Sequence, residues 1–198
     1  HGDYIIVRSY DTPEIPDCAT HRMEFTRVND SCFKVINEIK YSPALPSLPR
    51  VGVSLQMPGE FDQLEWFGMG PHESYVDRKR GTLIGRFSGS VREQYVPYIL
   101  PQENGNKTDV SYFSLANEFC RVVFLSDSLM QFSAHDYTAE DLFGCYHTNE
   151  VEDILADKTI VTIDHLQRGL GTASCGPETL EKYTITPGTY RFSFYILV

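Results

Sequence analysis

Residues 65–75 read Glu65-Trp66-Phe67-Gly68-Met69-Gly70-Pro71-His72-Glu73-Ser74-Tyr75, and they lie in the middle of the stretch that decides the fold, Leu48 to Asp109. An apolar run precedes this block at 51–57. A polar segment follows it at 101–109, which reads Pro101-Gln102-Glu103-Asn104-Gly105-Asn106-Lys107-Thr108-Asp109. Short apolar runs joined by long loops rich in Gly and Pro indicate β-strands. Loops of this kind commonly carry the binding groups of a β-scaffold.

The composition favours a packed β-domain. The 198 residues are 41% hydrophobic and include 12 Phe and 12 Tyr, and aromatic side chains are enriched in strands. The net charge of −10 disfavours a nucleic-acid partner, because phosphate binding requires clustered Lys and Arg. We interpret the one basic cluster, Arg78-Lys79-Arg80, as a solvated loop.

The spacing of the cysteines and the length of the apolar runs indicate which cellular compartment suits the chain. No two of the five cysteines are spaced as CxxC, so a thiolate zinc site or a dithiol redox site is disfavoured. An odd number of cysteines suits free thiols in a reducing compartment. No apolar run approaches the ~20 residues of a membrane span, and we recognise no signal peptide. We therefore expect a cytoplasmic protein without a membrane partner.

Hydrophobic alternation predicts strands along most of the chain. The pattern is clearest at 32–41, where Phe33, Val35 and Ile39 share one face. One helix is expected at 138–146, because Thr138 and Asp141 have the spacing of a capping box. Many short strands with one short helix indicate an all-β sandwich. The expected strands are 4–10, 21–28, 32–41, 51–57, 62–68, 83–87, 110–115, 119–125, 130–135, 159–166 and 190–198.

Two adjacent pairs of residues contain the groups needed for proton transfer, His72–Glu73 and Asp164–His165. Neighbouring residues in a strand point to opposite faces of the sheet. We therefore favour a structural role for both pairs.

Polar side chains also gather in the loop that contains Glu103, Asn104, Asn106 and Asp109. Carboxylates and amides are suitable partners for sugar hydroxyls. The alternative, which we favour, is that Asn and Asp cap the backbone of their own turns. Trp66 has the same two interpretations, sugar stacking or core packing, and its apolar surroundings favour the core.

The blocks already quoted, taken in order with three others, resemble the β-galactosidase small chain, the C-terminal domain of large bacterial-type β-galactosidases. Each block alone is a weak signal, whereas the ordered set from about Pro46 to the C-terminus is specific. The additional blocks are Leu48-Pro49-Arg50-Val51-Gly52, Asp77-Arg78-Lys79 with Tyr98, and Tyr190-Arg191-Phe192-Ser193-Phe194.

The resemblance implies an antiparallel supersandwich similar to galactose mutarotase. It also implies a catalytic barrel, in cis or as a separate large subunit, that supplies the two glutamates of a retaining hydrolase acting on β-galactosides such as lactose. The Mg and Na sites of the family would lie in that barrel, so we assign no catalytic residue, metal ligand or cofactor to this chain. We expect residues 1–198 to form a single small-chain domain that lacks its N-terminal part, and we expect an oligomer.

By resemblance, the segment from Gly169 to Pro177 lines the subsite for the leaving group, and we call it the rim loop. Its expected substrate-binding residues are Gly171, Ser174, Cys175 and Gly176. Cys175 stands where the family has a Trp, and a Cys offers no face for sugar stacking. The resemblance with this departure implies an altered preference for the sugar acceptor.

Two other functions remain open at this point. A free-standing mutarotase-like epimerase would use a histidine and a carboxylate, for which His165 and Glu103 are the candidates. A carbohydrate-binding or subunit-interaction module would bind without turnover, with His72, Glu103, Asn104 and His165 as candidate polar contacts.

Overall fold

In the computed structural model of the chain, residues 4–171 and 178–198 are described. The strands pair antiparallel throughout these ranges, and none of the helices there is long and apolar enough to cross a membrane. The strands are β1 (Tyr4–Tyr10), β2 (Ala19–Asn29), β3 (Cys32–Tyr41), β4 (Arg50–Pro58), β5 (Gln63–Gly70), β6 (Leu83–Ser90), β7 (Lys107–Ala116), β8 (Arg121–His135), β9 (Lys158–Gln167) and β10 (Thr189–Leu197). The helices are α1 (Ala139–Phe143) and three 3₁₀ segments, η1 (Arg92–Gln94), η2 (Thr148–Ile154) and η3 (Glu181–Tyr183).

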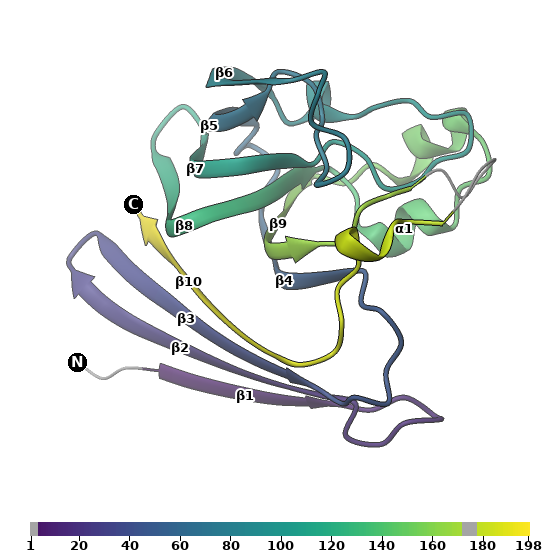
Figure 1. Cartoon of the computed structure of the whole chain (residues 1–198). Helices are drawn as coiled ribbons and strands as arrows, with labels where there is room; N and C mark the ends of the chain where they lie inside the picture. The colour runs from purple at the N-terminus through teal and green to yellow at the C-terminus, as the bar shows by residue number, and fades with distance from the viewer. Residues whose placement is uncertain (1–3, 172–177) are drawn as a thin grey trace.

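The sheet folds over into two facing layers because β8 pairs with different strands in the two halves of its length. The strand order is β1-β2-β3-β10-β8-β7-β5-β6, and β9 joins β8 to β4. The first half of β8 pairs with β10 and its second half pairs with β9. Figure 1 shows β1, β2, β3 and β10 curving beneath the remaining strands. This arrangement agrees with the expected all-β antiparallel sandwich.

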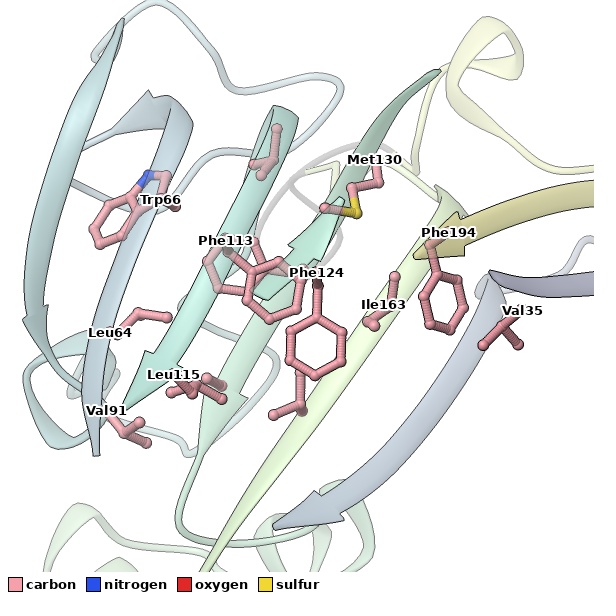
Figure 2. Packing of buried hydrophobic residues seen from close by; sticks show 14 residues of the cluster. Val35, Leu64, Trp66, Val91, Phe113, Leu115, Phe124, Met130, Ile163 and Phe194 are labelled. Carbon is pink, nitrogen blue, oxygen red and sulfur yellow. The ribbon is translucent and has the colours of Figure 1, made fainter. Parts of the chain in front are cut away.

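The core fills the space between the two layers. Trp66 is 1% exposed, whereas its neighbour Phe67 is 41% exposed, as period-two alternation requires. The Phe113 ring stacks on Phe124 at 4.6 Å and on Phe132 at 4.2 Å between ring centroids. Figure 2 shows Phe113 and Phe124, with side chains of the second layer such as Phe194 and Val35, pointing into one cluster. The core interpretation of Trp66 is therefore confirmed.

The expected helix forms, but it is shorter than the range 138–146. The Thr138 hydroxyl accepts from the Asp141 amide, and the Asp141 carboxylate accepts from the Thr138 amide, so the capping box is confirmed. The helix ends at Phe143, where the Gly144 amide donates to the Asp141 carbonyl and tightens the last turn. Farther along the chain, Thr148–Ile154 form η2, which the sequence pattern did not predict.

Two expected strands, 119–125 and 130–135, are a single strand, β8, of 15 residues. The segment 126–129 between them, exposed at 127–129, continues the strand. It lies where β8 exchanges β10 for β9 as its neighbour, and its polar side chains are solvated there.

Candidate functional site

The base of the rim loop is tied to the rest of the fold on both sides. Gly171 has φ +63°, a conformation that favours glycine, and its amide donates to Asp77 Oδ2 at 2.8 Å. The Thr179 hydroxyl donates to the Gly169 carbonyl at 2.8 Å. Three expected residues of the loop lie outside the described residues, namely Ser174, Cys175 and Gly176. The structure therefore describes the start of the loop, Gly169 to Gly171, and the segment that begins at residue 178 just beyond its end.

Beside this base lies a hollow of about 460 Å³. It is lined by Asp77, the residue that accepts from the Gly171 amide, and by His72 and Glu73. Glu73 is held by three donors: the Tyr98 hydroxyl, the Gly105 amide at 2.8 Å and the Arg78 guanidinium at 3.3 Å. His72 is exposed. Within the described residues no hydrogen bond joins it to Glu73, so this pair does not form a proton-transfer unit.

A second cavity of about 440 Å³ brings Glu103 and Asn104 together with Arg50 and His135. Glu103 Oε1 accepts from Gln167 Nε2 at 3.0 Å and lies 3.4 Å from Arg50 Nη2. This carboxylate is one-third exposed and remains accessible to a ligand.

Asn104 is 2% exposed, and its side chain organises the loop. Its Oδ1 accepts from the Val96 amide at 3.1 Å, and its Nδ2 donates to the Gln102 carbonyl at 2.9 Å and to the Tyr137 hydroxyl at 3.1 Å. These bonds support the loop-capping interpretation for Asn104.

Asp164 and His165 point to opposite faces of β9. Asp164 is fully buried, lies 3.2 Å from Arg50 Nη2, and has its pKa raised to about 7 by burial. The His165 ring stacks on Phe192 at 5.4 Å, and burial lowers its pKa. No hydrogen bond joins His165 to Asp164 or to Glu103 in the described part of the chain. The geometry therefore brings together neither the adjacent pair Asp164–His165 nor the pair considered for an epimerase, His165 and Glu103.

The family model described as "Beta galactosidase small chain" matches residues 3–196. The chain belongs to this family. Among curated relatives, the β-galactosidase of Priestia megaterium is 36% identical over 149 residues, which cover 74% of this chain and 14% of that protein. The β-galactosidase of Pseudoalteromonas haloplanktis is 33% identical over 172 residues, which cover 85% of this chain and 16% of that protein.

The small-chain sequence therefore spans only about one-seventh of the length of the relatives it matches. A solved structure from Escherichia coli K12, described as an aldose 1-epimerase, is also similar. It has 8% sequence identity and a TM-score of 0.48, with 98% of this chain and 64% of that chain covered.

Three residues that shape this small-chain domain were not singled out as site residues from the sequence: Arg50, Asp77 and His135. Arg50 and Asp77 stand in the sequence analysis only within the blocks that carry the family resemblance, and their partners come from distant segments. Gly52 carries a further signal, because a Cβ at this position would lie 2.1 Å from Asp164 Oδ1. A glycine two residues after Arg50 thus makes room for the buried carboxylate.

Within residues 4–171 and 178–198, no group of three or more His, Cys, Asp or Glu side chains is arranged to hold a metal ion.

Proposed function

We propose that this chain is the part of a β-galactosidase that packs against the catalytic barrel and shapes the leaving-group end of the substrate site. The barrel, in cis or as a separate large subunit, supplies both glutamates of a retaining mechanism and the Mg and Na sites. The substrates are terminal β-D-galactosides such as lactose, and the chain alone does not hydrolyse them. Support comes from the family match over residues 3–196 and from the greater length of the relatives.

The anchoring of the rim loop carries this proposal. Two hydrogen bonds of 2.8 Å hold Gly169 and Gly171 against Thr179 and Asp77. These bonds fix the first residues of the rim loop relative to the rest of the fold, and groups held in place are what a subsite requires. Cys175 at the Trp position removes a stacking surface, so we propose weak selection of the sugar acceptor.

The decisive assay uses a chromogenic β-galactoside with the purified chain alone, with a separately expressed barrel fragment from the same source, and with the mixture. Activity in the mixture only is the expected result. Activity of the isolated chain would contradict the proposal, because the catalytic pair would then lie within these residues. NMR of the first-formed galactose anomer tests the retaining mechanism, and an inverted product would contradict it.

The acceptor proposal has its own variant. Cys175→Trp should lower KM for lactose in the active mixture, and Cys120→Trp, at an exposed position, is the matched control. Equal effects of both substitutions would contradict a role for position 175.

We further propose that the assembly is oligomeric and cytoplasmic. Light scattering of the mixture tests the oligomeric state, and cell fractionation tests the location.

A further inference from the structure

The 440 Å³ cavity lies on the face of the sheet that turns away from the core. Its floor consists of two cross-strand pairs between β8 and β9, His135–Ile160 and Ser133–Thr162. These residues alternate with core residues such as Phe132 and Ile163, so they must point to the opposite face. Segment 100–104 and helix α1 form the walls. The cavity is therefore built from rigid strands and enclosed by two further segments.

Several polar groups in this cavity have hydrogen-bonding capacity left over. Glu103 is bound through Oε1, and within the described residues no bond is formed at its Oε2. The same holds for the hydroxyls of Ser133 and Thr162. Unused donors and acceptors that converge on a cavity are a typical feature of ligand sites.

His135 also lines the cavity. Its Nε2 lies 3.0 Å from the carbonyl oxygen of Asn104. A carbonyl only accepts, so Nε2 carries the proton. Burial lowers the pKa of His135 to about 4, so the ring is neutral at physiological pH and its Nδ1 is an acceptor.

The charges in the cavity disfavour an anionic ligand. Arg50 is the cationic lining residue, and it already lies within 3.4 Å of Glu103 and 3.2 Å of Asp164. A ligand carboxylate would face Glu103 without a free cation to offset the repulsion. Apolar surface is provided by Leu100 and by Phe143, whose side chain is 90% exposed.

From these observations we infer that the cavity binds a neutral monosaccharide, with the sugar ring against Phe143 and its hydroxyls on Glu103, His135, Ser133 and Thr162. A sugar ring combines a neutral apolar face with hydroxyls that both donate and accept, and the cavity offers a partner for each. This site is formed without the rim loop residues described above, and it goes beyond the role proposed for the chain in hydrolysis.

The test is an NMR titration of the ¹⁵N-labelled 198-residue chain with D-galactose and D-glucose. D-galacturonate serves as the anionic probe and cyclohexanol as the apolar probe of similar ring size. We expect one or both neutral sugars to bind, with shifts at 100–104 and 133–143. Galacturonate and cyclohexanol should bind at least about tenfold more weakly. Galacturonate carries a negative charge that Glu103 repels, and cyclohexanol lacks most of the hydroxyls that the cavity can bind.

Phe143→Ala should weaken sugar binding by about tenfold, because one stacking surface is lost. Phe119→Ala is the matched control, since this ring is 86% exposed and does not line the cavity. Thr162→Val keeps the shape of the side chain, removes the hydroxyl and should weaken binding by about fivefold.

Failure of both sugars to bind would overturn the inference. So would equal effects of Phe143→Ala and Phe119→Ala, or tighter binding of galacturonate or cyclohexanol than of both sugars. The titration needs no barrel fragment, so its outcome is independent of the complementation assay.

Discussion

Replacing Asp164 with Asn should change how the stability of the domain depends on pH. Asp164 is fully buried beside Arg50, and burial raises its pKa to about 7 from an ordinary value of 3.8. Below pH 3.8 the carboxyl is protonated in both the folded and the unfolded chain. Between 3.8 and 7 the unfolded chain ionises first, so rising pH favours the unfolded chain. Above about pH 7 the carboxyl is ionised in both the folded and the unfolded chain, and the loss of folding stability is complete.

The size of the effect follows from the two pKa values. At ~1.4 kcal/mol for each pKa unit, the loss between pH 4 and 8 is about 4 kcal/mol. Asn resembles the neutral acid and has no such loss. The difference in unfolding free energy between Asp164→Asn and the parent should therefore shift by about 4 kcal/mol in favour of the variant from pH 4 to pH 8.

Urea unfolding of both proteins at a series of pH values measures this difference. The comparison with the parent is essential, because His135 has its pKa lowered to about 4 by burial and contributes the opposite trend in both proteins. Asp153→Asn, at an exposed position, is the matched control and should follow the parent. A difference between Asp164→Asn and the parent that stays constant with pH would refute the reasoning, because Asp164 would then ionise as it does in water.

Three further changes test the core, the helix cap and the rim loop. Trp66→Ala should cost about 3–5 kcal/mol of unfolding free energy in urea, because the 1% exposed ring leaves a cavity; Phe67→Ala should cost less than half as much, and equal losses would contradict the core assignment. Thr138→Ala should cost about 1 kcal/mol and speed amide exchange in α1, so unchanged exchange would refute the cap. Gly171→Ala should cost at least about 1 kcal/mol in the same urea assay through its positive φ, and its Cβ would lie 2.8 Å from the Thr179 amide; unaltered stability would contradict this conformation.

The local elements were predictable because their causes are local. Alternation at 32–41 defines β3 with the bounds that the structure has, and the spacing of Thr138 and Asp141 defines the start of α1. The length of β8 was not predictable, because its exposed middle is set by an exchange of neighbours rather than by its own residues. The bending of the sheet into two layers has the same origin.

The candidate sites show the same division. Loop capping by Asn104 follows from residue type and its place beside Gly105, and the structure supports it. The environment of Glu103 depends on Arg50 and Gln167, which are 53 and 64 residues away in sequence. Spacing along the chain carries no information about contacts of this kind. His165 was a reasonable candidate by chemistry, but its strand turns it toward Phe192 instead of Glu103.

The position of β10 between β3 and β8 has a consequence for synthesis on the ribosome. About 150 residues separate the end of β3 at Tyr41 from the start of β10 at Thr189, so translation at ~5–20 residues per second leaves β3 unpaired on that side for roughly 7–30 s. During this interval Val35 and Ile39 lack the strand that covers their edge. An open apolar edge can pair with other nascent chains, so this domain should depend on chaperone protection until its last strand emerges.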